Sequence, residues 1–317
     1  MTVLTWIVGS GGLLGSALSK HVQEANRFES PGFNWNAHEL LTQQFDEAIK
    51  EFQHQAGQEP WCVIWAAGSA TTSTDVPATA RELSTFKHFT ETLRNHAPQG
   101  PGIFFLSSSA GGVYAGSSAP PFTDESEPIP LSAYGQLKLD QEQQAKEALK
   151  NTCPVIIGRI SNLYGPGQNL EKLQGLISRL ALSAITKEPI TMFVSLDTIR
   201  DYIYTDDAAK VILALVEAQQ KNAISNAGKN QASTVIIASG QPTSLGYLIN
   251  MMQDVAHTKI PVAYGNHSSA GAQARDLRLM PTNAKQAETL VNTPLSAGVK
   301  NVYLDILNRY QLALSPR

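Results

Sequence analysis

The sequence predicts an α/β fold, in which a doubly wound parallel sheet is followed by a smaller C-terminal α/β lobe. Short apolar runs alternate with segments that carry apolar residues at helical spacing, the pattern of helices that cross between parallel strands. Several runs are apolar at consecutive positions, as expected for strands buried on both faces. The first run ends in glycines that lead directly into a helical stripe. A chain of 317 residues can bury one large core or two lobes.

Each predicted strand is a short apolar run bounded by turn residues, and these runs span residues 3–8, 61–67, 103–106, 154–160, 190–194 and 235–238. The predicted helices carry an apolar stripe over residues 13–23, 38–52, 79–94, 132–149, 170–185, 206–218 and 244–255. Ser132 and either Thr243 or Ser244 are suitable N-caps for two of them. Residues 25–36 are ambiguous, and a second strand is expected to end near Phe33 or Trp35.

A glycine-rich turn joins the first predicted strand to the first helix. Gly9, Gly12 and Gly15 form a Gly-x-x-Gly-x-x-Gly pattern there. Without side chains, the backbone can approach a pyrophosphate, which the free N–H groups of the helix N-terminus would bind. The alternative is a glycine-rich turn without a ligand. We predict a dinucleotide site that includes Gly9, Gly11, Gly12, Leu13, Leu14 and Gly15.

The choice between NAD and NADP is left open by the sequence. An acidic residue about 20 positions after the glycines often binds the adenosine ribose. Glu29 comes too early for this role, and the later Asn34 and Asn36 are neutral. Asn34 is the candidate for a ribose hydrogen bond, and no obvious Arg follows to bind a 2′-phosphate. The predicted cofactor is therefore NAD or NADP.

Tyr134 and Lys138 are the candidate catalytic pair. They lie one helical turn apart and therefore face the same way. An ammonium group favours the phenolate of a nearby tyrosine, which could then exchange a proton with a substrate hydroxyl. A serine that ends the preceding strand would bind the substrate oxygen, with Ser109 the first choice and Ser108 the second. In isolation, an ordinary solvated helix face would be the favoured interpretation of the pair.

Composition and charge exclude several other classes of function. The net charge is −3 and the chain contains no basic run, so we expect no nucleic-acid partner. No apolar stretch approaches the length of a membrane span, and we expect no membrane partner and a cytoplasmic location. Cys62 and Cys153 lie in apolar runs and are predicted to be buried free thiols. The histidine and cysteine spacings predict no metal site.

Further motifs follow in a fixed order: the strand end Ala66-Ala67-Gly68, Val113-Tyr114 after the serines, Arg159-Ile-Ser-Asn162-Leu-Tyr-Gly-Pro-Gly167 and Arg200-Asp-Tyr-Ile-Tyr-Thr-Asp-Asp207. With the glycine turn and Tyr134/Lys138, they resemble the extended short-chain dehydrogenase/reductase family over nearly the whole chain, in particular its nucleotide-sugar epimerases, dehydratases and reductases. The resemblance implies a Rossmann domain over residues 1–165, to which 195–240 partly return, and a substrate lobe mainly over 166–317. It also implies a homodimer.

The resemblance assigns further residues to the site. Ala66, Ala67 and Gly68 would contact the cofactor, and the residues assigned to the nucleotide sugar are Asn162, Arg200, Tyr114 and Arg275. Arg200 would meet the diphosphate, although a surface ion pair is the alternative, and Asn162 could instead hold a turn.

The chain also departs from the family pattern. The segment before Trp61 is short, one extra residue precedes Val113, and the Asp-Glu pair of the dehydratases is replaced by small residues. We therefore predict an NAD(P)-dependent nucleotide-sugar epimerase, acting at C4. An NADPH-dependent keto-sugar-nucleotide reductase is the alternative, and a non-catalytic dinucleotide-binding regulator is the third reading.

Overall fold

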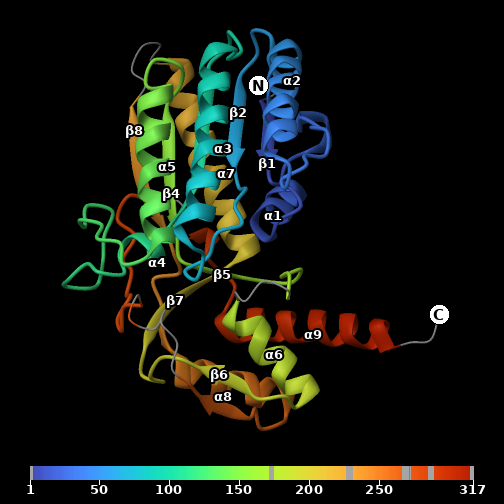
Figure 1. The fold of residues 1–317 in the computed structure, drawn as a ribbon, viewed down its shortest axis with the longest axis vertical. Coiled ribbons are helices and arrows are strands. Elements are labelled where there is room, and N and C mark those ends of the chain that lie inside the picture. Colours follow the sequence, from blue (N-terminus) through green and yellow to red (C-terminus); the bar gives the residue numbers. More distant parts are fainter. Residues whose placement is uncertain are drawn as a thin grey trace.

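A parallel sheet covered by helices stands above a smaller lobe of helices and short strands (Figure 1). The computed structural model of the chain describes residues 3–170, 175–225, 231–265, 271, 273–284 and 289–314. The predicted α/β fold class is confirmed, because the sheet is parallel throughout and helices flank it.

The main sheet has the strand order β1-β2-β3-β4-β8. Its strands are β1 (Leu4–Val8), β2 (Trp61–Trp65), β3 (Gly102–Ser109), β4 (Val155–Ile160) and β8 (Ala232–Ile237). The register places Val8 beside Trp65 and Trp65 beside Leu106, so the carboxyl ends of neighbouring strands lie side by side. The loops that follow these strands therefore meet at the carboxyl end of the sheet, where open α/β sheets bind ligands.

Helices bury the sheet on both faces. One core cluster joins the strands to α2 (His38–Ala56), α3 (Val76–Asn95) and α5 (Ala133–Leu149). A second cluster joins the opposite face to α1 (Leu13–His21) and α7 (Thr205–Ser225). The one-turn helix α4 (Ala110–Val113) follows β3 directly. Burial on both faces explains why the strand sequences are apolar without alternation.

The second strand expected near Phe33 or Trp35 does not form. After the 3₁₀ helix η1 (Glu24–Asn26), a single bridge pairs Arg27 with Thr5, and the described residues between β1 and β2 contain no strand. Side-chain contacts hold this segment in place of a strand ladder. Gln44 of α2 accepts a hydrogen bond from the Asn34 N–H at 2.9 Å and donates to the Gly32 carbonyl at 3.3 Å. Packing of Phe33 on Phe45 fixes the rest, with ring centroids 4.8 Å apart.

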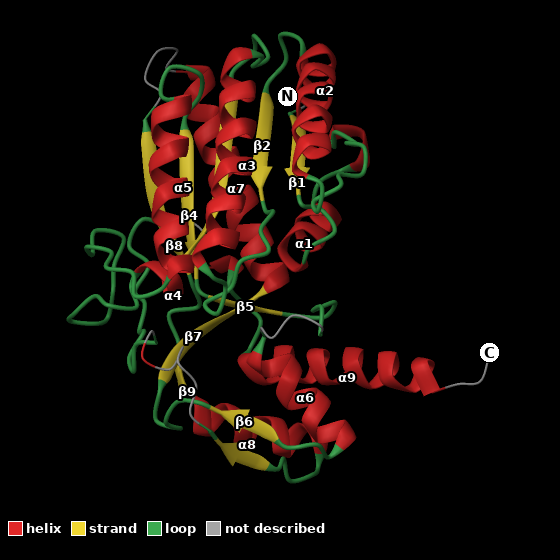
Figure 2. Cartoon of the chain, viewed as in Figure 1, coloured by secondary structure: helices red, strands yellow, loops and turns green. Residues whose placement is uncertain are grey.

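Figure 2 shows the helices and short strands of the lower lobe. This lobe has its own apolar core. Its helices are α6 (Leu176–Thr186), α8 (Leu245–Ala256) and α9 (Leu295–Leu314). The short strands β6 (Ile190–Met192) and β10 (Val262–Tyr264) pair in parallel. Between this lobe and the main sheet runs a small sheet of order β5-β7-β9, formed by β5 (Asn162–Tyr164), β7 (Ile199–Tyr204) and β9 (Pro242–Ser244).

Local expectations about caps and cysteines agree with the structure. Ser132 caps α5 by accepting a hydrogen bond from Gly135 N, and Ser244 caps α8 by accepting one from Tyr247 N. Cys62 and Cys153 are buried free thiols. Among the described helices, none is long and apolar enough to cross a membrane.

Candidate active site

The glycine turn after β1 is packed so closely that side chains are excluded at two positions. Gly9 has a φ of +91°, and a β-carbon there would lie 2.7 Å from Ala67 N. A β-carbon on Gly15 would lie 2.1 Å from the Gly9 carbonyl oxygen. Gly12 N donates to that same oxygen at 3.0 Å. The turn is therefore compact and lies directly against the loop that follows β2, as the predicted cofactor site requires.

The start of α1 can accept an anionic group. The N-cap is Gly12, whose lack of a side chain leaves the first helical N–H groups without a side-chain cap. Gly11 is exposed, and a β-carbon on it would meet no atom within 4 Å. Leu13 is half-buried and Leu14 is buried in the core. The glycine turn thus fits a pyrophosphate in its chemistry, since backbone N–H groups and a helix dipole meet at an uncovered position.

Asn34 is exposed and forms a local turn. Its side-chain oxygen accepts a hydrogen bond from Asn36 N at 3.3 Å, while its own N–H donates to Gln44. The side-chain amide nitrogen is on the surface of a segment that Gln44 anchors. Its contact with a cofactor ribose stays a prediction.

Tyr134 and Lys138 lie together on the first turns of α5. The Lys138 Nζ is 5.7 Å from the centroid of the Tyr134 ring. Lys138 is buried and donates to Gln141 Oε1 at 3.0 Å, whereas Tyr134 is only half-buried. A β-carbon on Gly112 would lie 2.9 Å from the Tyr134 ring, so the glycine of α4 makes room for it. The arrangement places a partly accessible phenol beside a buried ammonium group.

The two candidate serines have different surroundings. The Ser109 Oγ accepts a hydrogen bond from Gly112 N at 3.2 Å and so caps α4, while the residue stays half-buried. Ser108 is buried, and its hydroxyl donates to Glu142 Oε1 at 2.6 Å. Ser109 therefore keeps a hydroxyl hydrogen that can reach a ligand, whereas that of Ser108 is already bonded.

A buried ion pair holds this part of the site together, and it escaped the sequence reasoning. Arg159 of β4 donates to both carboxylate oxygens of Glu142, at 2.7 and 3.0 Å. It also donates to the Tyr114 hydroxyl at 2.7 Å, which in turn donates to the Thr123 carbonyl. Burial acts against the Arg159 charge, but the bonds to Glu142 outweigh it and raise the pKa. The available signal was Glu142, four residues after Lys138 on the same helical face.

Tyr114, predicted to contact substrate, is fully buried. Burial raises the pKa of its phenol, and the hydroxyl is bonded within the Arg159 network. The Tyr114 phenol is therefore enclosed, whereas Tyr134 is partly accessible. The substrate contact predicted for Tyr114 stays a prediction.

The residues assigned to the nucleotide sugar lie on the small sheet and beside it. Asn162 of β5 is exposed, and its side-chain amide donates to the Asp201 carbonyl at 2.8 Å, which ties β5 to β7. Arg200 of β7 is buried and donates to the Ile199 carbonyl at 2.8 Å, and burial lowers its pKa. It forms no ion pair with any described residue. Arg275, in contrast, is exposed and paired with Asp197.

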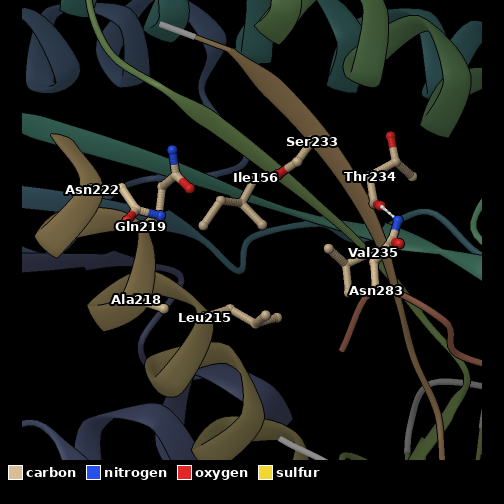
Figure 3. Close-up of a pocket in the computed structure, with 9 residues that line it drawn as sticks. All are labelled: Ile156, Leu215, Ala218, Gln219, Asn222, Ser233, Thr234, Val235 and Asn283. Atoms are coloured by element: carbon tan, nitrogen blue, oxygen red, sulfur yellow. Dashed lines mark hydrogen bonds between the residues drawn. The ribbon is translucent and has the colours of Figure 1, made fainter. Parts of the chain in front are cut away.

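A separate pocket of about 330 Å³ lies away from these residues (Figure 3). It opens between the C-terminal half of α7 and the first residues of β8, the outermost strand on the side of the sheet away from β1 and the glycine turn. Asn283 donates there to the Thr234 carbonyl at 3.4 Å. No lining residue carries a charge, so the chemistry of the candidate site is not found in this pocket.

The fold and the site define a class. A parallel sheet with a glycine turn after β1 and a Tyr/Lys pair at the same edge is the arrangement of a dinucleotide-binding dehydrogenase-type protein. The chain belongs to the NAD dependent epimerase/dehydratase family, which its sequence matches over residues 5–228. The resemblance to extended short-chain dehydrogenases/reductases is thereby confirmed, and the predicted nicotinamide dinucleotide cofactor agrees with the NAD dependence of the family.

Curated relatives match over part of their length. The chain is 33% identical over 121 residues to a dTDP-L-rhamnose 4-epimerase of Burkholderia thailandensis, covering 37% of this chain and 33% of the relative. It is 32% identical over 130 residues to a dTDP-4-dehydro-6-deoxyglucose reductase of Escherichia coli, covering 40% and 41%. It is 29% identical over 179 residues to the methionine adenosyltransferase 2 subunit beta of Rattus norvegicus, covering 52% and 48%. The chain thus spans less than half of each of these relatives.

Solved structures extend the likeness to the whole fold. The UDP-glucose 4-epimerase of Thermotoga maritima, solved with UDP-glucose, has a TM-score of 0.76 at 19% identity, covering 96% of this chain and 99% of that chain. RMD from Pseudomonas aeruginosa, complexed with NADPH, has a TM-score of 0.75 at 19% identity, covering 98% and 99%. At such identities the likeness establishes the fold.

Proposed function

We propose that the protein is an NAD(P)-dependent nucleotide-sugar epimerase that acts at C4. The observation that carries the proposal is the partly accessible Tyr134 phenol beside the buried Lys138, at the sheet edge where the glycine turn also lies. Tyr134 takes a proton from the sugar hydroxyl and later returns it. A nicotinamide dinucleotide held by the glycine turn would supply the hydride exchange at the carbon that bears this hydroxyl, with the keto-sugar turning in between so that its other face is reduced.

Lys138 and Ser109 act on either side of this proton transfer. The Lys138 ammonium favours the phenolate form of Tyr134 through its positive charge. The Ser109 hydroxyl donates to the sugar oxygen, while its oxygen still caps α4. Ser109 ends β3 and Lys138 lies on α5, and Gly112 and Gly135 allow α5 to approach closely α4, the helix that follows β3 directly. The two groups are therefore held by the scaffold and need little rearrangement to act.

Arg200 is the proposed diphosphate ligand. A buried guanidinium without a partner is costly, because its hydration is lost and only the Ile199 carbonyl replaces it among the described residues. A diphosphate would supply the missing acceptors in a bidentate geometry. In the same proposal, residues 1–165 hold the cofactor, and residues 166–317 contribute most of the sugar-nucleotide contacts.

The first test of this proposal is mass spectrometry of the nucleotide released when the purified protein is denatured. Stoichiometric NAD(H) supports the epimerase, which must retain its cofactor through the cycle. Tyr134→Phe should then nearly abolish turnover of a nucleotide sugar while leaving cofactor binding unchanged. Full activity of that variant would exclude the proposed mechanism.

A keto-sugar-nucleotide reductase is the second candidate. It is favoured by the neutral segment around Asn34, where an acid that would select NAD is missing, and by the reductase among the relatives. A protein that purifies empty, binds NADPH reversibly and consumes it with a keto-sugar nucleotide would establish this activity. No NADPH consumption across such substrates would count against it.

A non-catalytic role is the third reading. It gains support from the similarity to a methionine adenosyltransferase beta subunit, named as a subunit of another enzyme. The intact serine, tyrosine and lysine set speaks against it, and any turnover that depends on Tyr134 would exclude it. A homodimer, formed in the family through a four-helix bundle that includes the Tyr/Lys helix, stays a prediction, which light scattering after gel filtration would test.

A further inference from the structure

Glu82 of α3 extends from its helix to the loop that follows β2. Its Oε2 accepts hydrogen bonds from the backbone N–H groups of Ser69 and Ala70, both at 2.9 Å, and from the Ser69 hydroxyl at 3.2 Å. Three donors on one oxygen fix the orientation of the carboxylate. The other oxygen, Oε1, is therefore held in a defined direction as well.

The Oε1 atom is buried and accepts no hydrogen bond from the described residues. Lys138 Nζ is also buried, and among the described residues it donates only to Gln141 Oε1. Both atoms lie around one point: a β-carbon on Gly68 would be 3.1 Å from the Glu82 oxygen and 3.8 Å from the Lys138 nitrogen. Because Gly68 has no side chain, it places nothing of its own between the two groups.

We propose that Glu82 is a positioning residue that supplies the counter-charge of Lys138. Its carboxylate stabilises the ammonium and orients it beside Tyr134, while Oε2 fixes the loop of residues 68–70. The proposal rests on the proposed function, in which Lys138 acts on Tyr134. A buried charge is costly unless an opposite charge lies nearby, and Glu82 offers one from a neighbouring helix without forming a direct ion pair with Lys138.

One buried carboxylate of α5 is already neutralised. Glu142, on α5 itself, and Arg159, on β4, form a buried pair with each other. In α4, which packs against the start of α5, residues 110–113 include no titratable side chain. Removal of the Glu82 carboxylate would therefore change the net charge beside the Tyr134/Lys138 pair.

A purely structural reading would have Glu82 only anchor the loop. Glu82→Gln separates the two readings, because the amide oxygen can still accept from Ser69 and Ala70 while the negative charge is lost. Glu82→Asp keeps the charge but shortens the reach to the loop. Glu91→Gln is the matched control, since Glu91 is an exposed carboxylate of the same helix.

Two measurements test the proposal. In the pH profile of kcat/KM, Glu82→Gln should move both limbs to lower pH by about one unit, because a negative charge that disfavours phenolate and favours ammonium is gone. In the protein without substrate or cofactor, the tyrosinate absorbance of each variant minus that of its Tyr134→Phe form should show the same acid shift of its midpoint. Glu82→Asp and Glu91→Gln should keep the wild-type midpoints.

Unchanged midpoints in Glu82→Gln would overturn the proposal, whatever happens to kcat, because a structural anchor affects the rate without moving the titration. A shift of equal size in Glu91→Gln would also overturn it, since a general charge effect would then explain the result. If the wild-type protein turns over no nucleotide sugar, the proposed function fails, but the absorbance titration still decides the role of Glu82.

Discussion

Alanine substitutions in the glycine turn should differ widely in their effect on stability, because Gly15 is surrounded by backbone atoms and Gly11 is not. Gly15→Ala places a methyl group 2.1 Å from the Gly9 oxygen and 2.8 Å from the Ser10 Cα, both backbone atoms. Neither can move without displacing the turn or the start of α1. Gly11→Ala adds the same methyl group where no atom lies within 4 Å. Gly12→Ala is intermediate, with a closest approach of 3.3 Å.

The expected cost follows from these distances. Overpacking a rigid site costs about 1–3 kcal/mol, and Gly15→Ala should fall in the upper half of this range because only backbone can yield. For a chain of this size, about 2 kcal/mol corresponds to a fall in Tm of roughly 3 °C. Gly11→Ala should leave Tm within about 1 °C of wild type, since an exposed substitution without contacts is nearly neutral.

Thermal and urea unfolding of the three variants without ligand would measure the order, and titration with NADH and NADPH would follow. Gly15→Ala should also lose at least about tenfold in dinucleotide affinity, because the turn that faces the ligand has moved. Equal stability of Gly15→Ala and Gly11→Ala would refute the reasoning, since it would mean that the turn is not packed as described.

Other consequences follow from buried and surface charges. Glu142→Ala strands the Arg159 guanidinium and should lower the free energy of unfolding in urea by about 3–5 kcal/mol; a loss below about 1 kcal/mol would contradict this. Burial raises the pKa of Asp206, but the hydrogen bonds from Lys210 and His21 outweigh it and hold the pKa below its ordinary value. Because the pKa of Asp206 is lower in the folded protein than in the unfolded one, its ionised form stabilises the fold above the unfolded-state pKa, and this stability is lost as the pH falls through the folded-state pKa. Asp206→Asn should therefore lower the free energy of unfolding by less than about 1 kcal/mol at pH 7 and should not change it in strong acid. The buried thiols, whose pKa burial raises, should resist thiol reagents until the chain unfolds, and rapid labelling of the native protein would disprove their burial.

Local sequence patterns predicted the strands of the main sheet, β6 and most of the longer helices, because burial is visible in them, but they did not predict β5, β7, β9, β10 or α9. The strand at Trp61 is apolar at every position and is buried at every position. The end of α7 was predicted at Ala218, whereas the helix continues to Ser225. The polar residues after Ala218 break the apolar stripe, yet Gln220 is buried and donates to the Pro101 carbonyl at 2.7 Å. A tertiary contact of this kind leaves no periodic signal.

The motifs of the candidate site could be recognised in the sequence, whereas the residues that contact them from other elements could not. Spacing alone indicates Gly9, Tyr134 and Lys138, because a turn fixes the position of the glycine and a helix fixes the positions of the other two. Spacing does not indicate the carboxylates nearby, since the hydrogen bond between Glu142 and Ser108 joins residues 34 positions apart and the one between Glu82 and Ser69 joins residues 13 positions apart. Long-range pairs of polar side chains depend on the packing of helices against the sheet, which a single sequence does not specify.

Arg200 offers the most direct test of the substrate class, because its charge is buried and forms no ion pair with a described residue, although Asp276 acts on it electrostatically. If a diphosphate completes it, UDP or dTDP should raise Tm, and a ligand at about 100 times its Kd adds about 2.7 kcal/mol. Arg200→Gln should abolish most of this increase. Arg275→Gln should retain it, since that guanidinium is exposed and already paired with Asp197. Equal losses in the two variants would mean that general positive charge, rather than the buried guanidinium, recognises the diphosphate.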